Sequence, residues 1–195
     1  ELTRTRQADD DADALTAVAA TEAAKRRLIF QLLDLGLPVV PHVEDEDGDE
    51  GDATGLSFDL LASHDDEKVI IGHADGQITL DVAESDDARR EQVRRELGEP
   101  YRTMLGHLRH EIGHYYFPLL VGPDGVVPGA GHDRLARARE LFGDETADYG
   151  AALDRHYREG PPAGWPERYV SAYATMHPAE DWAETFAHYL HIRDT

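Results

Sequence analysis

Two histidines and a glutamate in the middle of the chain have the types and spacing of a metal-dependent hydrolase. His110, Glu111 and His114 form the pattern H-E-x-x-H. On a helix, residues four apart lie on one face about one turn apart, so both histidines can offer a nitrogen to one ion. Glu111 is expected to flank the ion and to accept a proton from the attacking water. The pattern predicts a catalytic zinc site, in which a third protein ligand leaves one position open for water.

Apolar side chains around this pattern recur at helical spacing, which predicts one long helix with a buried stripe. The stripe consists of Tyr101, Leu105, Leu108, Ile112, Tyr115 and Leu119. Glu99 and Pro100 are typical of a helix start, and Pro118 is expected to kink or end the helix just past His114. The two histidines lie beside the stripe, on a flank that we expect to face a cleft.

The third ligand is expected downstream, on a helix that begins at Pro178. Proline suits the first position of a helix, which places Glu180 and Glu184 one turn apart on the same face. Glu180 is the candidate third ligand, and Glu184 is the candidate partner of a ligand imidazole. A solvated acidic helix face is the alternative interpretation of both glutamates.

Aromatic and small side chains predict how these two helices pack. The aromatic residues expected to point toward the core, away from the two glutamates, are Trp182, Phe186 and Tyr189. Small residues on both helices favour a close approach between them. They are Gly106, Gly113, Ala183 and Ala187.

With these two motifs the sequence resembles a known family. Residues 110–116 together with residues 180–186 are similar to the bacterial putative zinc-binding metallopeptidases, a former domain of unknown function, and the similarity runs from about residue 78 to the end. The E-x-x-x-E arrangement after H-E-x-x-H is also similar to the gluzincin proteases, notably anthrax lethal factor. Both motifs together are quite specific.

The resemblance implies a role for each residue of the site. One zinc ion per chain is implied, held by His110, His114 and Glu180, with Glu111 as the general base and Glu184 outside the ligand set. Tyr173, seven residues before Glu180, is implied as a donor to the oxyanion of the transition state.

The predicted function is therefore a zinc-dependent hydrolase that cleaves peptide (amide) bonds of a peptide or protein substrate. Two alternatives stay open: a catalytically inactive metal-containing binding module, and a metal-dependent hydrolase of small amides or esters. The intact Glu111 argues against the inactive module. His107 lies one turn before His110 and is interpreted as a pocket residue or, at an awkward distance along the helix, as a further ligand.

Composition narrows the class of protein. The net charge of −21, from 19 basic and 40 acidic residues, argues against nucleic acid or an anionic membrane as partner. Without cysteine, thiolate zinc sites and cysteine nucleophiles are excluded. No signal peptide or apolar run long enough to span a bilayer is visible, so a cytoplasmic location is expected. The first residue is not methionine, which is consistent with part of a longer protein.

The fold class predicted is α+β and zincin-like: a single domain over residues 1–195 with a small mixed sheet packed on the motif helix and a mainly helical C-terminal half. The cleft is expected between the sheet edge and the C-terminal helices. Strand 77–83 is the candidate edge strand for binding extended peptide. The other expected helices lie at 9–35, 86–97, 134–142 and 146–158, and the other expected strands at 37–40, 56–61 and 68–71. A hairpin turn is expected at 74–76, a flexible acidic loop at 44–55 and a further loop at 121–131.

Overall fold

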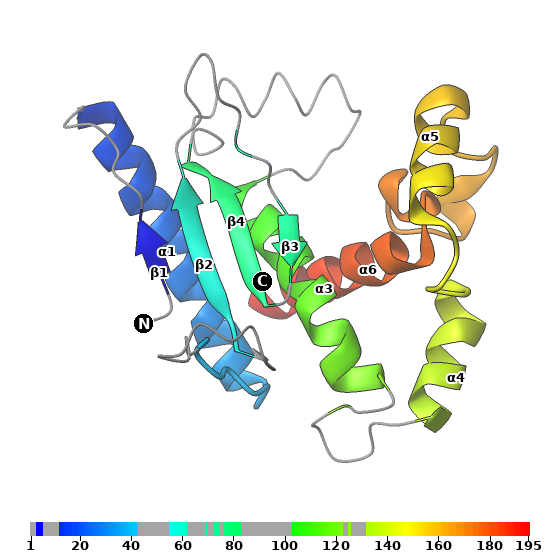
Figure 1. Ribbon diagram of the computed structural model, residues 1–195, viewed down its shortest axis with the longest axis horizontal. Coiled ribbons are helices and arrows are strands. Elements are labelled where there is room, and N and C mark those ends of the chain that lie inside the picture. The colour runs from blue at the N-terminus through cyan, green and yellow to red at the C-terminus, as the bar shows by residue number, and fades with distance from the viewer. Residues whose placement is uncertain are drawn as a thin grey trace, which may run out of the picture. The chain divides into compact units, whose positions relative to one another are not determined.

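The computed structural model shows an α+β protein (Figure 1). It describes residues 3–5, 12–42, 55–61, 69, 72–74, 76–82, 103–122, 125 and 132–195. The chain forms two compact units, residues 1–111 and 112–195, and the boundary between them falls inside the motif helix. In the described part of the chain, the strands lie in the first unit and the second unit is helical, which confirms the predicted α+β class. The zincin-like arrangement stays a prediction. The single domain stays a prediction.

The first unit contains a mixed four-stranded sheet with the order β1-β2-β4-β3. Its strands are β1 (Thr3–Thr5), β2 (Ser57–Leu61), β3 (Gly72–Ala74) and β4 (Gln77–Asp81). β2 pairs in parallel with β1 and with β4, whereas β3 pairs antiparallel with β4. β4 thus lies between two strands, so its prediction as an edge strand is wrong. The hairpin is the physical reason, because it folds β3 against the side of β4 that would otherwise be free.

The hairpin turn between β3 and β4 is confirmed. Ala74 pairs with Gln77, and Gly76 has a φ of 84°, a conformation that glycine adopts without steric cost. Ile78 and Leu80 of β4 and Val82, which follows the strand, are buried.

Helix α1 (Ala12–Asp34) agrees with the helix predicted at 9–35 over the described residues. Leu28 and Leu32 are buried in it, whereas Leu33 is exposed. Gly36 ends the helix with a φ of 69°, and the N–H of Leu37 bonds to the carbonyl of Leu32 at 3.0 Å.

The strand predicted at residues 37–40 is wrong. The structure instead has an isolated parallel β-bridge between Pro41, just after this segment, and Leu56. Pro38 and Pro41 lack an N–H, so this segment cannot supply the regular donors of a ladder.

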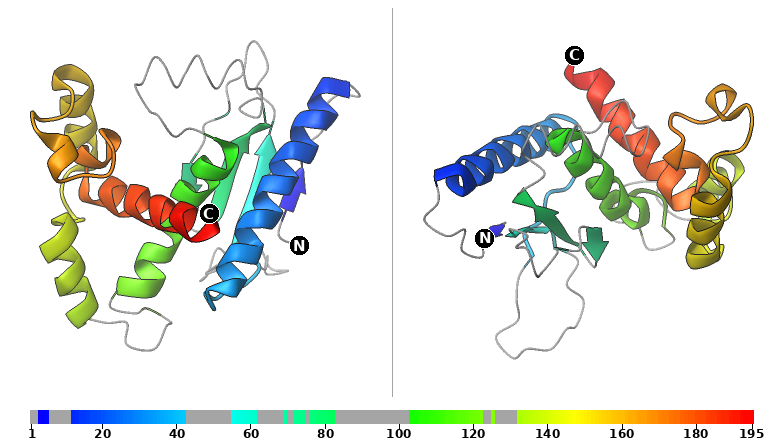
Figure 2. Two further views of the ribbon diagram at one scale, coloured as in Figure 1. Left: turned by 180° about the vertical axis from the view of Figure 1, so that it is seen from behind. Right: turned by 90° about the horizontal axis from the view of Figure 1, so that it is seen from above.

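One face of the sheet is covered by α1 and the N-terminal part of helix α3 (Met104–Val121) (Figure 2). The ammonium of Lys25 lies 5.8 Å from the ring centre of Phe58 on β2. The guanidinium of Arg109 is buried and donates from Nε and Nη2 to Gln31 Oε1 of α1, at 3.2 and 3.1 Å. The residue immediately before His110 therefore fastens the motif helix to α1.

Helix α3 is capped at its start and continues past Pro118. Its first residue is Met104, and Thr103 Oγ1 accepts the N–H of Gly106 at 2.9 Å as a helix cap. The helix continues through Pro118 to Val121, so it does not end at Pro118; the kink that was the other expectation there stays a prediction. Proline removes one hydrogen bond to the residue four before it, a loss that the last turn of a helix tolerates more easily than its middle does.

The buried stripe of α3 is confirmed at its centre. Leu108, Ile112 and Tyr115 are buried, while Leu105 and Leu119 are half-buried.

In its described residues, the second unit contains three further helices and two short 3₁₀ helices. They are α4 (His132–Phe142), α5 (Tyr149–Glu159), η2 (Trp165–Glu167), η3 (Tyr173–Thr175) and α6 (Pro178–Asp194). The helices predicted at 134–142, at 146–158 and from Pro178 onward are confirmed. Leu141 of α4 is exposed.

Several predicted segments lie wholly or largely outside the described residues: the acidic loop at 44–55, the strand at 68–71, the helix at 86–97, the helix start at Glu99 and Pro100, Tyr101 and the loop after α3. Among the helices that the structure describes, none has the length and apolar character needed to cross a membrane.

Candidate metal centre

Glu180 is placed by the first turn of α6. The ring of His177 precedes this helix and its Nδ1 accepts the N–H of Ala179 at 3.1 Å, and Pro178 takes the first helical position. Glu180 follows within the same turn, where the exposed N–H groups of the helix end favour a negative charge. Its side chain is almost fully buried.

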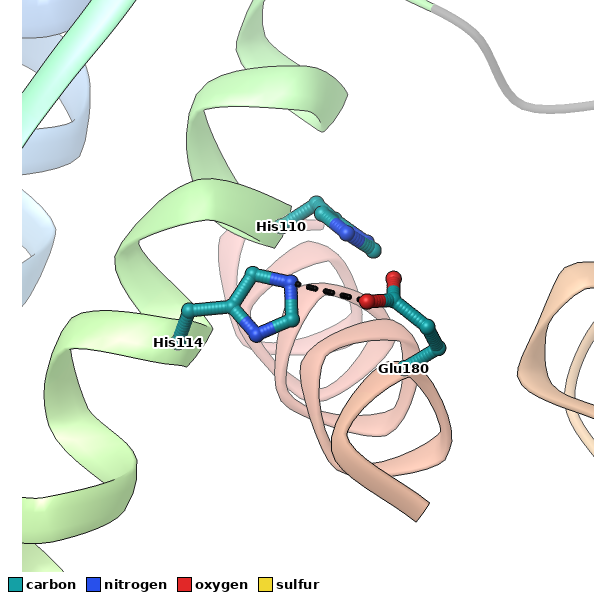
Figure 3. Close-up of side chains that lie close together, drawn as sticks. All are labelled: His110, His114 and Glu180. Carbon is teal, nitrogen blue, oxygen red and sulfur yellow. Dashed lines mark ion pairs between the residues drawn. The ribbon is translucent and has the colours of Figure 1, made fainter. Parts of the chain in front are cut away.

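The structure brings His110, His114 and Glu180 together. One ligand atom from each residue lies within 4.8 Å of the others. Nε2 of His114 is 3.5 Å from Oε1 of Glu180, and all three side chains point toward one another from α3 and α6 (Figure 3). All three residues were predicted as ligands from the sequence. Their binding of zinc stays a prediction.

The donor set fits a zinc ion. Two imidazole nitrogens and one carboxylate oxygen are ordinary zinc ligands, and three protein ligands are the number found in catalytic sites. The side chain of Glu180 is 3% exposed, but that of His114 is 22% exposed. The group is therefore buried on its carboxylate side and reachable by solvent on its imidazole side.

Helices α3 and α6 interlock beside these residues. Ala183 is buried against Gly113, as the small residues predicted. The indole Nε1–H of Trp182 donates to the carbonyl of Gly113 at 2.8 Å, and the rings of Tyr116 and Phe186 stack 5.7 Å apart. Tyr189, predicted to face the core, is instead exposed.

Gly113→Ala is expected to weaken both packing and zinc binding. A Cβ at this position would lie 3.0 Å from Ala183 Cα and 3.3 Å from its carbonyl oxygen, so α6 has to move away from α3. We expect a loss of about 1–2 kcal/mol in the free energy of unfolding, after the helix propensity of alanine offsets part of the clash. Zinc affinity should fall as well, because Glu180 moves with α6. Denaturant unfolding and zinc titration measure the two effects.

Gly150→Ala is the matched control for that substitution. A Cβ there meets only Asp148 Oδ1 at an ordinary 3.5 Å, and the position is exposed in α5. The free energy of unfolding of the Gly150→Ala protein should equal that of the unaltered chain or be slightly higher. Equal stability of the Gly113→Ala and Gly150→Ala proteins would contradict the tight packing of α6 on α3.

Glu111 is held by the side chain one turn before it. His107 Nε2 lies 3.1 Å from Glu111 Oε1, and the side chain of Glu111 is 9% exposed. Because an ionised carboxylate only accepts hydrogen bonds, Nε2 of His107 carries the hydrogen. His107 is not in the group that can hold a metal ion, which favours its interpretation as a pocket residue.

Tyr149 makes hydrogen bonds with both Tyr173 and Glu180, and the sequence analysis did not identify it as a site residue. The hydroxyl of Tyr149 donates to Glu180 Oε1 at 3.0 Å. Burial raises the pKa of Tyr173, and the negative charge of Glu180 and a hydrogen bond with Tyr149 raise it further. No spacing pattern connects residue 149 with residue 180, so only the fold reveals this contact.

Glu184 lies beyond these contacts, on the next turn of α6, and is half-buried. Burial raises the pKa of its neighbour Asp181 to about 6; a hydrogen bond from Thr185 opposes the shift, and the charge of Glu184 adds to it. The predicted hydrogen bond from a ligand imidazole to Glu184 stays a prediction.

The family of the chain follows from its sequence match. Residues 14–195 match the family described as Putative zinc-binding metallo-peptidase. The chain belongs to this family. The family description names zinc binding, and the group that could hold a metal ion consists of His110 and His114 on α3 and Glu180 on α6.

Related proteins occur in mycobacteria. Uncharacterized proteins of Mycobacterium tuberculosis and Mycobacterium bovis are 55% identical to this chain over 193 residues. The match covers 99% of this chain but 52% of each relative, so the chain spans about half the length of the curated relatives it matches. No solved structure matches the chain. The similarity of the motifs to the gluzincins and to anthrax lethal factor stays a prediction.

Proposed function

We propose that the chain is a zinc-dependent hydrolase of peptide bonds with a zincin-like active site. The observation that carries the proposal is the convergence of His110, His114 and Glu180 on one point, with Glu111 beside the first histidine. A centre kept only for structure has no need of a carboxylate in that place, whereas hydrolysis needs a base there. The membership of the family supports the same conclusion.

His110, His114 and Glu180 would hold the ion. Zinc, when bound, polarises a carbonyl and lowers the pKa of water toward neutrality. Glu111 accepts a proton from the water that attacks the amide carbon, so that a C–O bond forms. As the C–N bond breaks, Glu111 returns this proton to the leaving nitrogen. His107 keeps the Glu111 carboxylate in one orientation by donating to Oε1.

The substrate class in this proposal is a peptide or protein. An amide needs both a base and a proton donor for its poor leaving group, and one carboxylate can serve as both in turn. The large negative charge of the chain attracts cationic peptides and repels nucleic acid.

Zinc content and peptide cleavage test the proposal together. The chain, stripped of metal and reloaded, is expected to bind one zinc ion and then to cut members of a peptide library that includes basic sequences. Mass spectrometry identifies the new termini, and the metal-free chain in the same assay is the control. A zinc-loaded chain that cuts no peptide, or cuts equally well without metal, would contradict the proposed function.

A further inference from the structure

The oxygen of Glu180 that faces His114 has a second neighbour. Oε1 lies 3.5 Å from His114 Nε2 and accepts the hydroxyl hydrogen of Tyr149 at 3.0 Å. A carboxylate oxygen has two lone pairs, so one oxygen can accept this hydrogen bond and still bind an ion. Tyr149 therefore contacts the candidate ligand on the carboxylate oxygen that lies near His114.

A second tyrosine, Tyr173, makes a hydrogen bond with Tyr149. The single hydroxyl hydrogen of Tyr149 is directed to Glu180, so the hydrogen between the two tyrosines comes from Tyr173. The direction is thus fixed along the chain of groups: Tyr173 donates to Tyr149, and Tyr149 donates to Glu180.

The fold fixes the start of α5, where Tyr149 is the first residue. Asp148 caps this helix by accepting the N–H of Ala151 at 2.9 Å. The ring of His177 lies 5.1 Å from the ring of Tyr149, and its Nε2 is 3.0 Å from the carbonyl oxygen of Ala147. Because Nδ1 of His177 accepts a hydrogen bond, Nε2 carries the hydrogen and donates it to that carbonyl. His177 in this way ties the residues before α5 to the start of α6.

We propose that Tyr149 is a positioning residue of the metal centre: its hydroxyl holds the Glu180 carboxylate with Oε1 toward His114, and Tyr173 acts through Tyr149. This inference rests on the proposed zinc site and deepens it. It differs from the sequence-based role of Tyr173 as a direct donor to the transition state. Groups that hydrogen-bond a metal ligand orient it before the ion arrives, and removing them typically lowers metal affinity about 10- to 100-fold.

Tyr149→Phe tests the proposal, since phenylalanine keeps the ring against His177 and removes only the hydroxyl. Competition with a chromophoric chelator should show zinc affinity about tenfold lower than in the unaltered chain. The thermal midpoint of the metal-free protein should stay the same, which separates positioning from a loss of folding. Tyr189→Phe, an exposed tyrosine on α6, is the matched control and should leave affinity unchanged.

The double variant tests the order of the groups. Tyr173→Phe should lower zinc affinity less than Tyr149→Phe, and adding it to Tyr149→Phe should lower affinity no further, because residues acting in series are not additive. Turnover of Tyr149→Phe should recover when zinc is saturating. Unchanged affinity in Tyr149→Phe, additive losses in the double variant, or turnover that stays low at saturating zinc would each overturn the inference. Absence of zinc binding in the unaltered chain would instead overturn the proposed function.

Discussion

Glu111→Gln is expected to lower kcat/KM for a cleaved peptide by about 10²- to 10⁴-fold, the usual contribution of a general base. Glutamine has nearly the same shape as glutamate and can still contact His107, but it cannot accept the proton of the attacking water. It also contributes no atom to the group of His110, His114 and Glu180, so zinc affinity should change little. Steady-state cleavage of the best library peptide, measured on zinc-saturated protein, gives the comparison.

The control for that result is Glu140→Gln on α4, because the side chain of Glu140 is 65% exposed. This variant should cleave the peptide at the rate of the unaltered chain. If Glu111→Gln retains more than a tenth of the activity while zinc remains bound, Glu111 is not the general base.

Glu180→Ala is expected to weaken zinc binding more than about 100-fold, because even groups one step removed from an ion contribute 10- to 100-fold. The loss removes one of three converging ligand atoms and leaves His110 and His114, both on one helix, to hold the ion alone. Zinc should then stop stabilising the fold. At a zinc concentration 100 times the Kd, the unaltered chain gains about 2.7 kcal/mol in the free energy of unfolding, a gain that the variant loses.

Isothermal titration and thermal unfolding with and without zinc measure both effects of Glu180→Ala. Glu167→Ala, at an exposed position in η2, is the control and should bind zinc as the unaltered chain does. Equal zinc affinity in Glu180→Ala and Glu167→Ala would show that the third ligand lies elsewhere.

Local patterns in the sequence predict the helices of the site well. The spacing of His110 and His114 and the buried stripe around Leu108 and Ile112 are properties of one helix, so 3.6-residue periodicity is enough to define them. Pro178 likewise marks the start of α6 and fixes the turn that contains Glu180. The small residues predict a close approach of the two helices, and Gly113 and Ala183 make it.

Features that depend on contacts between distant segments are not visible in the sequence. The sequence of β4 predicts a half-buried strand whether the strand lies inside the sheet or at its edge. Its inside position is known only from its pairing with β2 and β3. Arg109 looks like a surface charge until Gln31 of α1 is placed against it. Tyr149 and Glu180 lie on different helices, so no periodic spacing in the sequence relates them. The turn before α5 and the cap of α6 bring the two side chains together.

X-ray diffraction from zinc-loaded crystals, recorded on both sides of the zinc absorption edge, locates a bound zinc ion directly. We expect one anomalous peak per chain, at about 2.0–2.2 Å from an imidazole nitrogen of His110, an imidazole nitrogen of His114 and a carboxylate oxygen of Glu180. A peak bound by other residues, or no peak in crystals grown with saturating zinc, would contradict the proposed zinc site.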